Sequence, residues 1–556
     1  MPMISPSAHL RAGRHAGLLI PLFSMPSRQS WGIGEIGDIP LMAAWLRGAH
    51  QDLLQLLPIN EMAVGQRSPY SAMTAMAIDP IFISVHAVEE FRAIGGEAGM
   101  TPDWRDRLMA ARRAPAIDHA TVRSVKAEAL RAAFARFKRE HWAPASSRAA
   151  ALRAWSEDQS WWLSDYALYR ALRAADRDRP WLEWPTALRD REPGALALAR
   201  RDLRDEILYR QWLQWIADTQ WCEAKELARP VSLMGDLPFM VDGDSADVWA
   251  NAEAFRLDAS VGAPPDAFSV TGQNWGMPAY RWDVMQRQDY RWLRERARRS
   301  AAIFDGYRVD HLVGFYRTYQ FPLDGSPAHF SPALEDEQLR LGETVLTIFA
   351  EPGARIIAED LGTVPDFVRA SLARLDVPGY KVFRWERHWS KDGQPYRDPA
   401  AYPASSVATS GTHDTEPTAA WWDGLDDVER RKVLEAPGVA ERLAAAGGRD
   451  ARPTQSSQDT GSTQAFTPAL RDIFLEVLFA SGSDFLLLPI QDVFGWRDRI
   501  NVPGSQGDRN WTWRLPWPID DLASQPDARE RCRALRAWTE RCSRQITAFG
   551  APDRKL

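Results

Sequence analysis

Short apolar runs recur along this chain, and most are bounded by glycine, proline or a charged residue. Such runs, rich in leucine and β-branched residues, are typical of strands that are buried on both faces. Stretches with helical periodicity, such as residues 292–304 and 365–375, separate most of them. Eight parallel strands joined by helices predict a closed (β/α)8 TIM barrel of the α/β class. The predicted strands are residues 16–23, 52–59, 231–239, 304–311, 354–361, 380–385, 406–414 and 484–492.

The spacing of these predicted strands is uneven. Roughly 170 residues separate the second from the third, far more than one connecting helix needs. Residues 122–137, 161–172 and 207–228 within this gap have the pattern of amphipathic helices. We therefore expect a single catalytic barrel over residues 1–556, with a mostly helical insertion subdomain at 60–229. A stretch rich in glycine and proline at 261–278 predicts a long rim loop, and the polar stretch at 447–464 predicts a mobile segment.

Charge and composition limit the classes of function that this chain can have. The chain has 68 Lys and Arg against 74 Asp and Glu, a formal net charge of -6, which argues against a nucleic-acid partner and fits a neutral substrate. Cys222, Cys532 and Cys542 are too scattered for a disulfide framework or a zinc site. No apolar run is long enough for a membrane span, and the N-terminus lacks the pattern of a secretion signal. We therefore expect a cytoplasmic protein without a membrane partner.

Three of the predicted strands end in a carboxylate. Asp310 closes the run at 304–311, Glu359 closes the run at 354–361, and Asp414 closes the run at 406–414. In a β/α barrel the catalytic residues lie where strands meet the loops that follow them. Three acids at one rim suit the processing of glycosidic bonds, with one as nucleophile, one as acid/base and one gripping the sugar.

The neighbours of the first two acids suggest different roles. Arg308 precedes Asp310 by two positions and so points to the same side of the strand, where it can hold the carboxylate ionised, as a nucleophile requires. Glu359 follows an apolar strand, and partial desolvation would raise its pKa toward that of a general acid. Taken alone, the Arg308–Asp310 pair also fits a structural ion pair at a strand end.

Further short motifs accompany these acids. They are Gly-Asp-Leu-Pro at 235–238, Asp-Ser-Ala-Asp-Val-Trp-Ala at 244–250, the rim stretch at 264–276, Arg-Val-Asp-His at 308–311, Ala-Glu-Asp-Leu-Gly at 358–362, Gly-Thr-His-Asp at 411–414 and Asn-Val-Pro-Gly at 501–504. In this order they resemble the 4-α-glucanotransferases, also called amylomaltases or disproportionating enzymes. These form glycoside hydrolase family 77 of the α-amylase clan. The resemblance runs from residue 17 to residue 515, nearly the whole chain.

The resemblance implies a retaining transfer of α-1,4-glucan segments to the 4-hydroxyl of an acceptor, through a covalent glucosyl-enzyme and without a metal or organic cofactor. Maltooligosaccharides and α-1,4-glucans would be the partners, with glucose as an acceptor. Carried over by position, Asp310 is the nucleophile, Glu359 the acid/base and Asp414 the transition-state stabiliser. The residues expected to contact substrate are Arg308, His311, His413, Asp236, Trp275, Asp266, Tyr70 and Asn501.

The chain also departs from the family pattern. Family members commonly have an aromatic residue where this chain has Ala267 and an asparagine where it has Met277, and they often continue with Asn-Asp-Thr where it has Thr-Glu-Pro at 415–417. These changes bear on acceptor handling more than on the bond chemistry. Two alternatives are an α-glucan hydrolase and a catalytically silent glucan-binding protein. Silent relatives usually lose a catalytic acid, and here all three are present.

Overall fold

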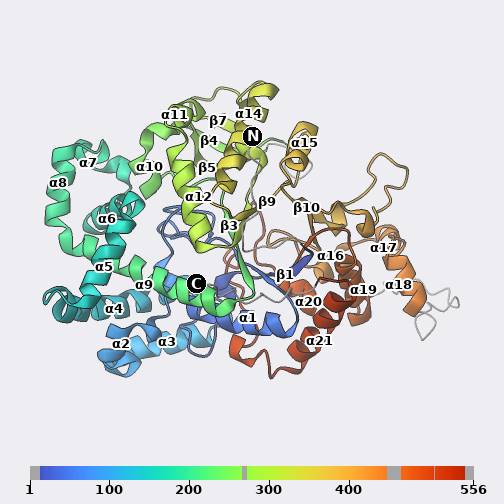
Figure 1. Ribbon diagram of the computed structural model, residues 1–556, viewed down its shortest axis with the longest axis horizontal. Helices are drawn as coiled ribbons and strands as arrows, with labels where there is room; N and C mark the ends of the chain where they lie inside the picture. Colours follow the sequence, from blue (N-terminus) through green and yellow to red (C-terminus); the bar gives the residue numbers. More distant parts are fainter. Residues whose placement is uncertain (1–12, 266–271, 447–464, 506, 545–556) are drawn as a thin grey trace, which may run out of the picture.

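The structure, a computed structural model, describes residues 13–265, 272–446, 465–505 and 507–544. Within these ranges eight parallel strands close into a barrel in the order β1-β12-β11-β10-β9-β6-β3-β2, and helices surround it (Figure 1). The predicted (β/α)8 barrel is therefore confirmed, and each predicted strand corresponds to one barrel strand. The barrel strands are β1 (His15–Leu19), β2 (Leu53–Gln55), β3 (Ser232–Leu237), β6 (Gly306–Val309), β9 (Arg355–Ala358), β10 (Gly379–Val382), β11 (Ser406–Thr409) and β12 (Phe485–Pro489).

The barrel strands are mostly apolar because both of their faces are buried. One set of side chains from different strands forms a cluster of its own, and the alternate set packs against the surrounding helices. The strands are shorter than the apolar runs predict, because the last residues of each run leave the ladder and enter the rim loops. The inner cluster consists of Leu53, Met234, Ile357, Tyr380, Val382, Val407, Phe485 and Leu487.

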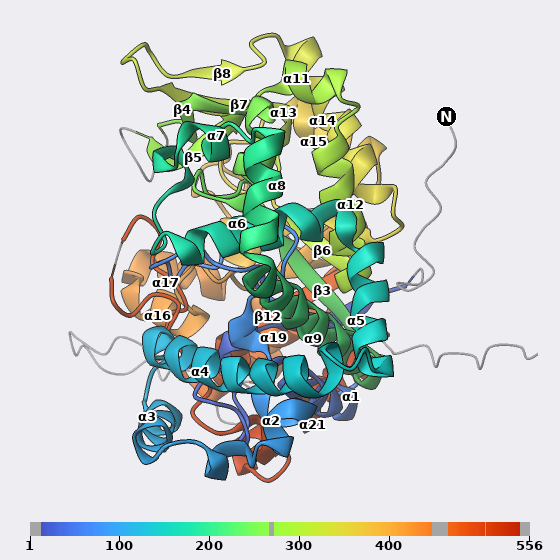
Figure 2. The same cartoon turned by 90° about the vertical axis from the view of Figure 1, so that its left-hand side faces the viewer.

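Helices α2 to α9 lie between β2 and β3, and three of them coincide with the amphipathic stretches seen in the sequence. These are α4 (His119–Phe137), α6 (Ser160–Ala175) and α9 (Arg204–Ala228). Figure 2 shows α4 and α9 lying in front of the barrel strands. The boundaries 60–229 for an insertion subdomain stay a prediction. The other helices of this region are α2 (Glu89–Ala93), α3 (Pro102–Arg113), α5 (Ser147–Asp158), α7 (Thr186–Arg189) and α8 (Pro193–Asp202).

The remaining helices lie between the other strands or after the last one, and α12 and α15 coincide with helical stretches predicted from the sequence. Among the described residues no helix is both long enough and apolar enough to cross a membrane. These helices are α1 (Ile39–Gly48), α10 (Ala246–Ala250), α11 (Trp282–Arg287), α12 (Arg291–Ile303), α13 (Val313–Tyr316), α14 (Glu335–Ala350), α15 (Asp366–Arg374), α16 (Thr418–Gly424), α17 (Asp427–Leu434), α18 (Val439–Ala446), α19 (Pro468–Phe479), α20 (Ile490–Phe494) and α21 (Pro526–Arg541).

The sequence predicts a long loop at 261–278, but the structure has strands in this rim segment. It contains the end of β4 (Phe255–Ala263) and most of β5 (Gln273–Tyr280), which pair antiparallel. In the described chain these strands join β7 (Thr318–Pro322) and β8 (His329–Ser331) in a four-stranded sheet, visible at the top of Figure 2. Local sequence missed this sheet because β4 is held by β7, a partner far away in the chain. Residues 266–271, between β4 and β5, and the polar stretch at 447–464 lie outside the described residues.

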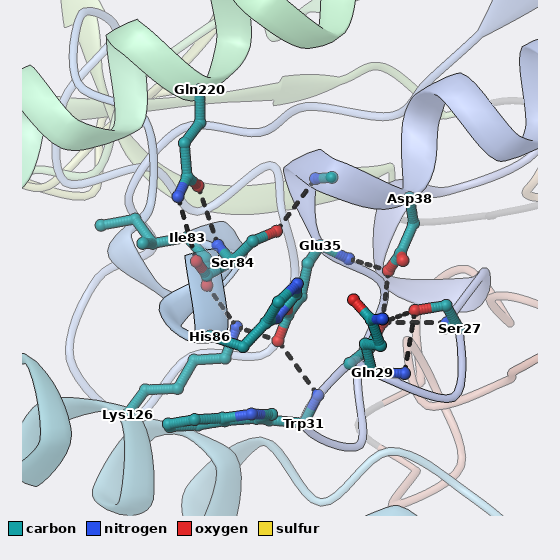
Figure 3. A network of polar contacts seen from close by, with 12 residues as sticks. Ser27, Gln29, Trp31, Glu35, Asp38, Ile83, Ser84, His86, Lys126 and Gln220 are labelled. Carbon is teal, nitrogen blue, oxygen red and sulfur yellow. Dashed lines mark hydrogen bonds and ion pairs between the residues drawn. The ribbon is translucent and has the colours of Figure 1, made fainter. Parts of the chain in front are cut away.

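A buried polar network fixes the helical region to the first barrel loops (Figure 3). Lys126 of α4 reaches into this network, where its Nζ lies 2.7 Å from the Glu35 carboxylate and donates to the carbonyls of Ile81 at 2.6 Å and Ile83 at 2.8 Å. Lys126 and Glu35 are both buried. Lys126 thus joins helix α4 to the loop after β1 through an ion pair, and to the segment after β2 through hydrogen bonds.

We expect Lys126→Met to lower the free energy of unfolding by about 3–5 kcal/mol, because it removes the buried cation that pairs with Glu35 and the donor to two carbonyls. Lys138→Met is the matched control, since Lys138 makes an exposed ion pair with Asp205 from the same helical region. It should change stability by less than about 1 kcal/mol. Chemical denaturation of both variants measures the difference. Equal losses would show that the buried pair contributes no more than a surface pair.

Candidate active site

Strand register brings the first two acids together. In the parallel pairing of β3, β6 and β9, Asp236 lies opposite Arg308, and Val309 lies opposite Ala358. Asp310 and Glu359 are each one residue beyond that last pair, and the Glu359 backbone N–H donates to the Val309 carbonyl at 3.0 Å. The two carboxylates therefore leave neighbouring strands at the same level of the barrel rim.

Arg308 is the centre of this charge cluster. Its Nη1 donates to both oxygens of Asp236, at 2.8 and 2.7 Å, and its Nη2 lies 2.8 Å from Asp310 Oδ1 and 3.9 Å from Glu359 Oε2. Burial opposes the charge, but the surrounding acids, led by Asp236, outweigh it and raise the pKa of the guanidinium well above its usual value. Arg308 stays charged and orients Asp310 more closely than Glu359.

Glu359 has a different environment from Asp310. Its Oε2 accepts the His311 backbone N–H at 2.8 Å, and its Oε1 accepts the Leu361 backbone N–H at 3.1 Å. Burial, reinforced by the nearby Asp310 charge and opposed by Arg308, raises the pKa of Glu359 to about 7. This residue can therefore hold a proton near neutral pH, as a general acid must.

His311 and Trp275 form one wall next to these acids. Their rings meet edge to face with centroids 4.8 Å apart. The backbone of His311 has φ of 43°, in the left-handed region that non-glycine residues rarely adopt, and the same residue directs its N–H to Glu359. Burial lowers the pKa of the His311 ring to about 4, so it is neutral at pH 7.

Asp414 follows β11 and is held from two sides. Asn501 Nδ2 donates to its Oδ1 at 2.7 Å, and His413 Nε2 lies 3.3 Å from its Oδ2. Burial works against ionisation, but His413, Asn501 and Arg308 outweigh it and hold the pKa of Asp414 well below its usual range. The side chain is 43% exposed, so this carboxylate is ionised and accessible.

Tyr70 connects the third acid to the Arg308 cluster. Its ring stacks on the His413 ring at 5.2 Å, and its hydroxyl donates to Asp236 Oδ2 at 2.7 Å. Burial and the charge of Asp236 raise the pKa of Tyr70, so the hydroxyl keeps its proton. The buried Trp511 ring lies 5.8 Å from Tyr70 and 5.9 Å from His413, so it packs against this stacked pair.

Most of the site residues predicted from the sequence are thus connected by contacts in the structure, with one exception. Asp266, with the neighbouring Ala267, lies outside the described residues. Sequence reasoning did not select Trp511 or Arg499, although Arg499 lies two positions before Asn501 and binds the Asp414 carbonyl at 2.9 Å. Among the described residues no group of three or more His, Cys, Asp or Glu side chains could hold a metal ion.

Fold and site together define the class of this protein. It is a (β/α)8-barrel enzyme whose acids converge at the carboxyl ends of the barrel strands, an arrangement suited to cleaving and re-forming glycosidic bonds. One acid has a raised pKa and another a lowered one. Such a divergence between the acids of one site is a mark of acid–base sites.

Comparison with known proteins identifies the family. The model of glycoside hydrolase family 77, described as 4-alpha-glucanotransferase, matches residues 20–520. The 4-alpha-glucanotransferase of Thermus thermophilus is 31% identical over 544 residues, which cover 95% of this chain and 99% of that protein. That of Chlamydia pneumoniae is 29% identical, over 93% and 95% of the two chains. The chain belongs to the 4-alpha-glucanotransferase family.

A solved structure agrees with this assignment. The amylomaltase from Streptococcus agalactiae in complex with acarbose superposes with a TM-score of 0.77 and 25% sequence identity, covering 96% of this chain and 100% of that one. The barrel and its surrounding helices are therefore those of the family.

The raised pKa of Glu359 predicts a pH-dependent stability. A carboxyl group of pKa 4.5 in the unfolded chain and about 7 in the folded protein stabilises the fold fully below pH 4.5. That stability is lost as the pH rises through 7. Between pH 5 and pH 8 the free energy of unfolding of the wild type should therefore fall relative to Glu359→Gln.

Chemical denaturation at both pH values measures this difference. Glu335→Gln is the control, because Glu335 is an exposed acid in the first turn of α14, and its variant should follow the wild type. Identical pH dependence in the wild type and Glu359→Gln would contradict the raised pKa.

Proposed function

We propose that this protein is a 4-α-glucanotransferase that moves a segment of an α-1,4-glucan to the 4-hydroxyl of an acceptor glucose or maltooligosaccharide. Asp310 is the nucleophile, Glu359 the acid/base and Asp414 the stabiliser of the transition state. The assignment rests chiefly on one observation. The acid with the raised pKa, Glu359, and the ionic partner of Arg308, Asp310, lie at the ends of neighbouring strands.

In the first half-reaction Glu359 gives its proton to the glycosidic oxygen while Asp310 attacks the anomeric carbon. The bond to the leaving sugar breaks, and a covalent glucosyl-enzyme forms on Asp310. Arg308 suits Asp310 to this role, because an ion pair at 2.8 Å orients the carboxylate. Asp414, ionised and accessible, interacts with the ring hydroxyls as positive charge develops on the sugar.

In the second half-reaction Glu359 has lost its proton and acts as a base. It takes the proton of the acceptor 4-hydroxyl, whose oxygen attacks the anomeric carbon and releases Asp310. Two inversions at one carbon retain its configuration. Water in place of the acceptor would make the enzyme a hydrolase. Two partly exposed aromatic residues of the rim, Trp275 and Tyr70, are suited to hold a sugar there instead.

The substrate class is part of the proposal. The Streptococcus agalactiae amylomaltase was solved in complex with acarbose, and the same family relation suggests that α-glucans bind along the rim of this barrel. The expected substrate contacts are Arg308, His311, His413, Asp236, Trp275, Tyr70 and Asn501, with Asp266 among the residues outside the described part. The enzyme is expected to work without a metal or organic cofactor.

We expect the purified protein to convert maltotriose into glucose and longer maltooligosaccharides in buffer containing a metal chelator. Transfer should dominate, because the acceptor displaces water from the glucosyl-enzyme. Chromatography of the products, with and without added glucose, measures the outcome. Release of glucose without any longer product would identify a hydrolase, and binding without turnover would identify a silent glucan-binding protein.

The roles of the two acids can be separated with a glucosyl fluoride, a donor whose leaving group needs little protonation. Glu359→Gln should lose about 10²- to 10⁴-fold in activity on maltotriose yet still form the glucosyl-enzyme from the fluoride. Asp310→Asn should form no glucosyl-enzyme from either donor, because it lacks the nucleophile. Intact-protein mass and peptide mapping measure the label. A sugar attached to a peptide that lacks Asp310 would overturn the assignment.

A further inference from the structure

The turn after Asp414, where the sequence reads Thr-Glu-Pro, has a defined structure of its own. Thr415 closes the turn on itself, since its Oγ1 accepts the Thr412 backbone N–H at 3.0 Å and donates to the Thr412 carbonyl at 3.1 Å. Pro417 then precedes the first residue of α16. Between these two fixed residues, the Glu416 side chain is bound by two arginines.

Glu416 bridges Arg384 and Arg499 with its two oxygens. Arg384 Nη1 donates to Oε1 at 3.2 Å, and Arg499 Nη1 donates to Oε2 at 3.3 Å. Arg384 is buried and also donates to the carbonyls of Ser410 at 3.3 Å and of Glu416 itself at 3.0 Å. The carboxylate therefore connects a rigid arginine beneath the turn to a second, more accessible one.

Arg499 uses its remaining donors on both sides of the third acid. Its Nη2 donates to the Asp414 carbonyl at 2.9 Å, and its Nε donates to the Asn501 carbonyl at 3.1 Å. These are the two residues whose side chains meet at 2.7 Å, where Asn501 Nδ2 binds Asp414 Oδ1. The Arg499 guanidinium thus binds the backbone of Asp414 and the backbone of Asn501, the residue that donates a hydrogen bond to the Asp414 carboxylate.

We propose that Glu416 is a positioning residue that fixes Arg499 and, through it, the orientation of Asp414. The carboxylate of Asp414 is 43% exposed, so packing alone does not determine its direction. The proposal rests on the proposed role of Asp414 in the transition state. The proposal also changes how the departure from the family's Asn-Asp-Thr is interpreted. Glu416 would support Asp414 through Arg499 and would not contact the acceptor sugar.

The charge of Glu416 is needed because its two oxygens accept from two cations. A glutamine side chain has nearly the same shape, but its amide accepts from one arginine only and directs an N–H toward the other. Without the contact to Glu416 Oε2, Arg499 would hold the Asp414 and Asn501 carbonyls less firmly. A misplaced stabiliser affects the transition state more than the bound substrate.

The test compares Glu416→Gln, Arg499→Lys and the double variant with the wild type in the disproportionation of maltotriose. We expect each single variant to lose roughly 10- to 100-fold in kcat, with KM changed by less than about threefold. The double variant should lose no more than the worse single variant, because both changes break one chain of contacts. Asp423→Asn is the matched control, since Asp423 on α16 makes an exposed ion pair with Arg497 at 2.7 Å, and its kcat should be unchanged.

Several outcomes would overturn this proposal. An unchanged kcat in Glu416→Gln would do so, as would a raised KM at constant kcat, which would mark Glu416 as a sugar contact. Additive losses in the double variant would show that the two residues act separately. Rates are normalised to the fraction of enzyme that forms a glucosyl-enzyme from the fluoride donor, so misfolding cannot imitate the effect, and Arg499→Lys decides if Glu416→Gln does not fold. An inactive wild type would instead refute the proposed function.

Discussion

The active site depends on a buried positive charge. Arg308 lies at the end of a barrel strand, bonded to Asp236 and paired with Asp310, with Glu359 at 3.9 Å. Burial and the charge of Asp310 raise the pKa of Asp236 and of Glu359, and Arg308 opposes both shifts. The guanidinium therefore makes a dense cluster of acids compatible with a folded barrel.

Arg308 also lies at different distances from Asp310 and Glu359. Arg308 contacts Asp310 directly but reaches Glu359 only at longer range, and Glu359 is further desolvated. As a result the two carboxyl groups differ in their contact with the cation, and Glu359 holds a proton near neutral pH. This separation is what a two-step retaining reaction requires of its nucleophile and its acid/base.

Segments that are distant from one another in the sequence are joined around these acids and the loops that carry them. The Lys126–Glu35 pair joins α4 to the first barrel loops, and Tyr70, from the segment after β2, connects Asp236 to His413. On the opposite side Asn501 supports Asp414 from the chain after β12. The site is therefore built from segments that are distant in sequence and held by polar contacts between loops.

The sequence by itself determined the barrel and its acids. Strands buried on both faces are mostly apolar, so the eight runs could be recognised in the sequence. A carboxylate at the end of such a run, like Asp310 or Glu359, is then located by its strand. Only the tertiary structure decided the rest. β4 pairs with β7, which follows it only after β6 and α13. The pKa of Glu359 depends on burial, and the partners of Glu416 come from other rim segments. Such contacts leave no local periodicity, because they join residues that meet only after the barrel has closed.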